Sequence, residues 1–259
     1  MKKLALAVVC AMLYIPLAGA YVIDGDVDDW GIDLNNADSM GYLDNYLPSG
    51  GLDIDAVTED NTDAFQEWKQ VYPGWSYKNK FDAEAMYFDN DAHNAYIAII
   101  TGLPESGSNG WAPGDIGIDV NRDGVYEFGL NIRNKELYSS LTGNDWNGVG
   151  INWSPSTPGP WTIKDGEGID KGSVNFVYSS VQNTHYVLEA SIPLSLLGIS
   201  ANPGDPINYL DIHWTMECGN DYLNLSADVN PVPEPSSIAL MLMGFLGLAG
   251  VKFHRVKIL

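Results

Sequence analysis

The sequence predicts an all-β protein built around a single β-sandwich with long loops. Runs of β-branched and aromatic residues recur along the chain, and clusters of Gly, Pro, Asn and Asp separate them. Sandwiches show this pattern, whereas parallel α/β folds alternate strands with helical segments of ten or more residues. Only one segment has helical spacing, so we expect six to nine strands and one short helix, in a jelly-roll or immunoglobulin-like arrangement.

The strands are expected where apolar runs are bounded by turn residues. In chain order these runs are residues 85–88, 95–101, 115–120, 125–132, 174–179, 186–192 and 207–217. The helix is expected at residues 63–72, because Asp63 can cap its start and Phe65, Trp68 and Tyr72 share one helical face. Residues 139–172, rich in Gly, Ser and Trp, are expected to form a long loop.

The N-terminus has the three parts of a secretory signal peptide. Lys2 and Lys3 precede an apolar run over residues 4–17, and residues 18–20 supply the small side chains at which signal peptidase cleaves. We therefore expect a short apolar helix here, cleavage after Ala20, and export of a chain that begins at Tyr21.

The C-terminus carries a second segment of three parts. Pro233, Glu234 and Pro235 are followed by an uncharged apolar run over residues 238–251 and then by a basic cluster, Lys252, Arg255 and Lys257. Fourteen helical residues rise about 21 Å, against a hydrocarbon core of about 30 Å, so a transmembrane helix here would be a short, marginal anchor. The basic cluster favours a cytoplasmic C-terminus. The alternative is a buried helix of the globular domain.

This order of parts resembles the PEP-CTERM sorting signal, and Pro233, Glu234 and Pro235 correspond to its three-residue motif. The resemblance implies a Gram-negative bacterium in which an exosortase of the inner membrane handles the tail. It also implies a membrane-anchored precursor that reaches the cell surface or the extracellular matrix. The chain then divides into a signal peptide (1–20), an exodomain (21–231) and a sorting and membrane-anchor segment (232–259).

The exodomain is strongly acidic. Its eight Lys and Arg residues face 33 Asp and Glu residues. Nucleic acid is excluded as a partner, because binding to phosphates needs the opposite charge. Cys218 is the one cysteine left after loss of the signal peptide, so the exodomain has no internal disulfide. We expect this cysteine to be buried and chemically inert.

Three segments of the exodomain resemble the DOMON-like and family-nine-like carbohydrate-binding modules. They are residues 22–30 (VIDGDVDDW), 87–99 (YFDNDAHNAYIAI) and 186–198, which contains YVLEASIP followed by Leu197 and Gly198. The resemblance implies a DOMON-like sandwich and a carbohydrate ligand. The long stretch 139–172 departs from the pattern, which leaves a ligand site in that stretch without support from the family.

One acidic segment has the ligand spacing of a calcium loop. Oxygen-bearing side chains occupy positions one, three, five and nine, a glycine occupies position six, and Val125 can offer its carbonyl; the candidate ligands are Asp119, Asn121, Asp123, Val125 and Glu127. Hard oxygen ligands that converge in a tight turn suit Ca²⁺. Position twelve is Leu130 rather than the usual glutamate, and the flanks are strands. The alternative is an acidic hairpin turn that binds no metal.

Tryptophans in the expected loops are candidates for sugar contacts. An indole ring stacks on the apolar face of a sugar, and nearby Asn and Asp side chains bind its hydroxyls. The candidates are Trp111, Trp146, Trp153 and Trp161. The alternative for each is that the ring caps the end of the sandwich.

Motifs of the common enzyme classes are absent from the sequence, which has no G-x-S-x-G, H-E-x-x-H, C-x-x-C or phosphate-binding glycine loop. We therefore expect a non-catalytic surface or matrix protein that binds extracellular polysaccharide. The alternative is a structural, calcium-braced surface or biofilm protein with no specific glycan. A secreted hydrolase with paired carboxylates is a third, weaker interpretation.

Overall fold

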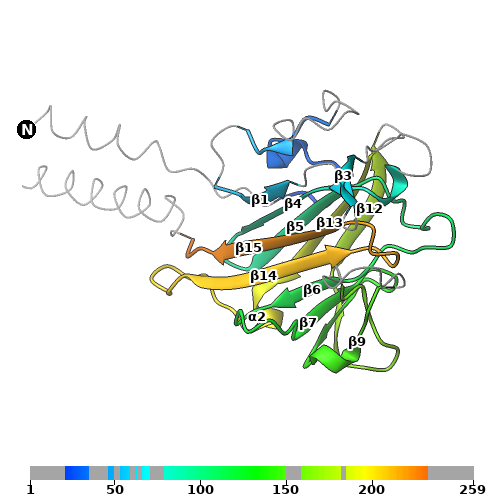
Figure 1. Ribbon diagram of the computed structural model, residues 1–259. Helices are drawn as coiled ribbons and strands as arrows, with labels where there is room; N and C mark the ends of the chain where they lie inside the picture. The colour runs from blue at the N-terminus through cyan, green and yellow to red at the C-terminus, as the bar shows by residue number, and fades with distance from the viewer. Residues whose placement is uncertain are drawn as a thin grey trace, which may run out of the picture.

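The computed structural model describes residues 21–34, 46–49, 53–58, 62–63, 66–70, 79–149, 159–181 and 185–232. Two antiparallel sheets face each other as a sandwich (Figure 1). The five-stranded sheet has the order β1 (Asp55–Thr58), β4 (Ala83–Asn90), β5 (Asn94–Thr101), β13 (His185–Pro193) and β12 (Asn175–Val181). The six-stranded sheet has the order β11 (Ile169–Ser173), β8 (Glu136–Ser139), β7 (Phe128–Asn131), β6 (Ile116–Asp119), β14 (Asn208–Thr215) and β15 (Tyr222–Val229). The predicted sandwich is confirmed.

The main core fills the space between the two sheets. Along β15, buried Leu223, Leu225, Ala227 and Val229 alternate with more exposed residues, as expected for a strand with one face on a core and one in water. Trp214 of β14 and Ile97 of β5 belong to the same buried cluster, as does the free Cys218. At one side the sheets are joined by a hydrogen bond from the Asp228 amide to Asp55 Oδ2 (2.7 Å).

The central strands of the five-stranded sheet are buried on both faces. Residues 21–34 cover the outer face of this sheet and include the short 3-10 helix η1 (Asp28–Trp30), shown in blue in Figure 1. Trp30 is fully buried there against Tyr87 and Val187. Its indole Nε1 donates to Glu189 Oε1 (2.9 Å), and the Gly25 amide donates to Glu189 Oε2 (2.6 Å). A buried carboxylate therefore ties the N-terminal segment to β13.

The seven predicted strands are present, but the predicted helix at residues 63–72 is wrong. That stretch contains a hairpin of β2 (Thr62–Asp63) and β3 (Gln66–Gln70) instead. Helical spacing of a few aromatic residues is a weak preference, and strand pairing overrides it here. Among the described residues, the one α-helix is α2 (Leu194–Leu197), which starts directly after Pro193 and ends at Gly198 in the left-handed conformation (φ 72°).

Short 3-10 helices and a two-stranded pair lie in the connections between the strands of the two main sheets. The 3-10 helices η3 (Asn79–Phe81) and η4 (Gly143–Asp145) lie between strands, and β9 (Trp146–Asn147) pairs with β10 (Thr162–Ile163). Within the described ranges, no helix is long and apolar enough to cross a membrane. The predicted helices at residues 4–17 and 238–251 lie outside the described residues, as do the sorting motif and the basic cluster.

Candidate functional site

The acidic loop, residues 119–127, connects β6 to β7 and folds around one buried aspartate. Asp119 is 1% exposed. Its Oδ1 accepts hydrogen bonds from the amides of Asn121 (3.1 Å) and Arg122 (2.6 Å), and its Oδ2 accepts one from Gly124 (2.8 Å). The loop turns at Arg122 and Gly124, which both have positive φ. The carboxylate thus shapes the turn that the sequence pattern predicts.

Three of the predicted ligands meet in this loop. Oxygen atoms of Asp119, Asp123 and Glu127 lie within 4.8 Å of one another, so this triad could hold a metal ion. Asn121 is close by, because its Nδ2 donates to Glu127 Oε1 (2.6 Å). The Val125 amide donates to Asp123 Oδ1 (2.9 Å), and the atom that Val125 can offer to an ion is its carbonyl oxygen. An all-oxygen set of this kind fits Ca²⁺ better than Zn²⁺.

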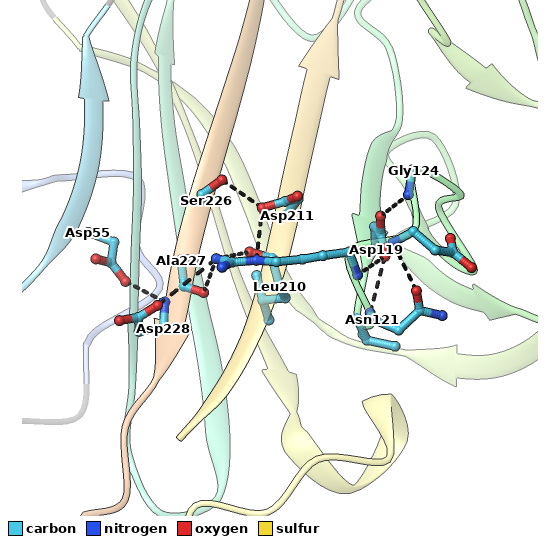
Figure 2. A network of polar contacts seen from close by, with 12 residues as sticks. Asp55, Asp119, Asn121, Gly124, Leu210, Asp211, Ser226, Ala227 and Asp228 are labelled. Atoms are coloured by element: carbon cyan, nitrogen blue, oxygen red, sulfur yellow. Dashed lines mark hydrogen bonds and ion pairs between the residues drawn. The ribbon is translucent and has the colours of Figure 1, made fainter. Parts of the chain in front are cut away.

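Arg122 fixes the acidic loop to the neighbouring strands, a role that the sequence pattern did not indicate. Its Nη2 donates to the carbonyl oxygens of Leu210 on β14 (3.3 Å) and Ala227 on β15 (3.1 Å), and its Nε lies 3.1 Å from Asp211 Oδ1. The labelled residues of Figure 2 show this line of contacts running from Asp119 across both strands to Asp228 and Asp55. The loop is therefore braced by the sheet and by its own backbone.

The four candidate tryptophans occupy different surroundings. Trp146 is 6% exposed and packs with Leu141 and Ile163, and its Nε1 donates to the Tyr126 carbonyl oxygen (3.3 Å). Trp111 is partly buried against the main core. Trp153 lies outside the described residues. Trp161 is half-buried, and among the candidates it is the one that lines a cleft.

The Trp161 cleft lies at the end of the β6–β7 hairpin opposite the acidic loop and has a volume of about 470 Å³. Polar residues from five separate chain segments line it together with Trp161. They include Glu105, Asn131, Arg133, Asn147, Thr162 and Lys164. A ring beside amide, hydroxyl and charged groups is a surface that suits a polyhydroxylated ligand.

Asp115 assembles this cleft from distant segments. It is 4% exposed, and its Oδ2 accepts hydrogen bonds from Asn131 Nδ2 (3.1 Å), Thr162 Oγ1 (2.6 Å) and the Ile163 amide (2.9 Å). Its Oδ1 accepts one from the Ile132 amide (3.0 Å). Burial raises the pKa of the Asp115 carboxyl, and the hydrogen bonds from Thr162 and the two amides act against that shift.

Gly114 allows the Trp161 segment to approach the sheet. A Cβ at this position would lie 2.4 Å from the Trp161 carbonyl oxygen and 2.1 Å from that of Thr215. The Asp115 amide donates to the same Trp161 oxygen (2.7 Å), and the Trp161 amide donates to the Asn147 oxygen (3.0 Å). Trp161 is thus held through its backbone beside the cleft that it lines.

Comparison with known proteins identifies one segment of the chain. The PEP-CTERM protein-sorting motif matches residues 231–256. No curated protein and no solved structure matches the chain, so the resemblance to DOMON-like and family-nine-like modules gains no support. The motif implies an exported, C-terminally anchored surface protein that an exosortase processes.

The sorting motif begins where the sandwich ends. The match starts at Pro231, and the Val232 amide still donates to the Ala201 carbonyl oxygen (3.0 Å). Asn230 is fixed as well, because its amide donates to Asn90 Oδ1 (2.8 Å) and its carbonyl accepts from Asn90 Nδ2 (2.9 Å). The folded body therefore extends to the residue before Pro233.

Proposed function

We propose that this protein is a surface or matrix adhesin, exported by signal-peptide cleavage, whose sandwich binds extracellular polysaccharide at the Trp161 cleft without catalysis. The observation that carries the proposal is the cleft itself, which places a half-buried indole among side chains that bind hydroxyl groups. Stacking of a sugar ring on an indole, with hydrogen bonds at the ring edge, is a common way to hold a glycan weakly and reversibly.

The construction of the cleft supports a binding role. Four hydrogen bonds to Asp115 hold the side chains of Asn131 and Thr162 and the backbone amides of Ile132 and Ile163, so these segments of the cleft are in place before a ligand arrives. A preorganised site loses less conformational entropy on binding. The sorting motif starts directly after the sandwich, at the end of β15 that pairs with Asn208, whereas the Trp161 segment lies against Thr215 at the other end of β14. An anchored precursor would therefore hold this cleft at the end of the sandwich away from the anchor, and processing by exosortase would determine where it is finally displayed.

A glycan array tests the proposal most simply. The full chain, purified in a detergent without a sugar headgroup, should bind a subset of bacterial exopolysaccharides. Trp161→Ala should lose about tenfold or more in affinity, whereas Trp161→Phe, which keeps an aromatic ring, should lose less. Equal binding by wild type and Trp161→Ala would show that the glycan binds elsewhere, and no binding to any polysaccharide would overturn the adhesin proposal.

The acidic loop favours a second candidate function. In this alternative the protein is a structural component of the surface or biofilm, braced by Ca²⁺ at Asp119, Asp123 and Glu127, with no specific glycan. The two candidates differ in their ligands: a stabilising shift in melting temperature with Ca²⁺ and with no polysaccharide would favour the structural role. Release of reducing sugar from a bound polysaccharide would contradict both and indicate a hydrolase.

A further inference from the structure

Basic side chains gather at the Trp161 cleft although they are rare in the exodomain. Of its eight Lys and Arg residues, set against 33 carboxylates, Arg133 and Lys164 line the cleft and Lys135 lies beside it. An adjoining hollow of about 200 Å³ shares Arg133 and Lys164. The rest of the exodomain has few cations and a strongly negative net charge. The cations at this cleft therefore point to a ligand that carries negative charge.

Two of the acids at the cleft are already engaged by the protein. Glu105 Oε1 lies 3.9 Å from Lys135 Nζ, and Lys135 also lies over the Phe176 ring, 5.6 Å from its centroid. Asp115 uses both carboxylate oxygens on its four hydrogen-bond donors. The acids that remain are Asp165, which lines both the cleft and the adjoining hollow, and Glu167, which lines the hollow.

Arg133 and Lys164 are both exposed, and neither forms an ion pair with any described residue, but the guanidinium of Arg133 donates no hydrogen bond to those residues either. Lys164, in contrast, donates through Nζ to the Asn144 carbonyl oxygen. A planar guanidinium with free N–H groups binds a carboxylate through two parallel hydrogen bonds, a geometry that a neutral sugar hydroxyl cannot reproduce. At physiological salt, screening over about 8 Å limits repulsion from the distant acids of the body.

We infer that the cleft takes a carboxylated sugar, a uronic acid unit whose ring stacks on Trp161 and whose carboxylate binds Arg133. This inference rests on the proposed polysaccharide-binding function and names the ligand class for the same cleft. It predicts selection of acidic exopolysaccharides over neutral ones of the same backbone.

A pair of polymers that differ only in charge tests the inference. Polygalacturonate and its methyl ester share one backbone, and only the first carries free carboxylates. Affinities for both are measured by calorimetry with the full chain in a detergent without a sugar headgroup. Calcium-free buffer is used so that a bridging ion cannot mimic direct binding. Arg133→Gln removes the charge at the cleft, and Lys171→Gln, an exposed change on β11, serves as the matched control.

Wild type should bind polygalacturonate about tenfold more tightly than the ester, and Arg133→Gln should abolish that preference while Lys171→Gln keeps it. Equal affinity for the two polymers would overturn the inference but leave glycan binding at the cleft standing. A preference that survives in Arg133→Gln, or failure of both polymers to bind while the chain binds a neutral glycan, would also overturn it. Failure of every polysaccharide would instead overturn the underlying adhesin proposal.

Discussion

Two buried aspartates, at the two ends of β6, organise their surroundings in opposite ways. Asp119 accepts hydrogen bonds from amides two, three and five residues further along the chain, whereas Asp115 binds groups 16 to 48 residues away. The first forms a turn that the local sequence specifies by itself. The second forms a cleft that exists only when the whole fold is in place. A local acidic turn suits a structural role, and a cleft between distant segments suits ligand recognition.

Loss of the Asp115 carboxylate should lower the free energy of unfolding more than the other changes considered at the two ends of β6. Asp115→Ala leaves the buried amides of Ile132 and Ile163 without an acceptor, so we expect a loss of about 3 kcal/mol in the free energy of unfolding. Chemical denaturation of the full chain measures this loss. Asp165→Ala, an exposed change in the same cleft, is the control and should cost little. A loss below 1 kcal/mol for Asp115→Ala would show that the cleft assembles without this carboxylate.

Calcium should stabilise the protein through the acidic loop at the Asp119 end of β6, independently of Asp115 at the other end. If the acidic loop binds Ca²⁺, a concentration 100-fold above the dissociation constant stabilises the protein by about 2.7 kcal/mol. Asp119→Ala should remove that stabilisation, because it deletes a ligand of the triad, whereas Asp115→Ala should retain it. Melting temperatures with calcium and with chelator provide the comparison. Loss of the calcium effect in both variants would mean that the two ends are not independent.

The same difference between local and remote partners determines which features could be predicted from the sequence. The acidic loop is contiguous, so its ligand pattern could be found by spacing. Apolar runs between turn residues predict seven strands, and the alternation of Leu223, Leu225, Ala227 and Val229 would also have indicated β15. The Asp115 hub and the reach of Arg122 to β14 and β15 have no local signal, because their partners are remote. The burial of Trp146 likewise depends on Leu141 and Ile163 across the fold.

Removal of the Arg122 side-chain charge should have a smaller effect at the acidic loop. Arg122→Met loses two hydrogen bonds to strand carbonyls and the contact with Asp211, all at a partly exposed position. We expect a loss of about 1 kcal/mol in the free energy of unfolding and weaker calcium binding. Lys80→Met is the control for loss of a positive charge at an exposed site. Unchanged stability and calcium affinity in Arg122→Met would show that the sheet does not brace the loop.

In the described part of the chain, the buried carboxyl of Glu84 lacks the full set of hydrogen-bond donors that surrounds Asp115 and Asp119. Glu84 on β4 is 1% exposed, and its Oε1 accepts no hydrogen bond from the described residues. Burial raises the pKa of Glu84, and hydrogen bonds with Tyr46 and Asp82 only oppose that shift. The folded protein therefore keeps this proton at pH values where the unfolded chain has lost it, so stability falls as the pH rises above the ordinary carboxyl range.

The slope of this fall is at most about 1.4 kcal/mol per pH unit for one proton. Glu84→Gln cannot ionise, so its free energy of unfolding should decrease less between pH 5 and pH 8 than that of wild type. Glu167→Gln, at an exposed position, should follow the wild-type curve. Chemical denaturation at several pH values in this range gives the free energy of unfolding of each protein. If the free energies of wild type and Glu84→Gln change in parallel with pH, Glu84 is ionised in the folded state throughout this range.

Amide hydrogen exchange of the full chain, with and without a bound exopolysaccharide, tests the central claim most directly. The account predicts slower exchange at the backbone amides around Arg133 and from Trp161 to Lys164, with the acidic loop 119–127 unchanged. Slower exchange confined to the acidic loop, or to strands remote from the Trp161 cleft, would contradict a glycan site at the Asp115 end of β6.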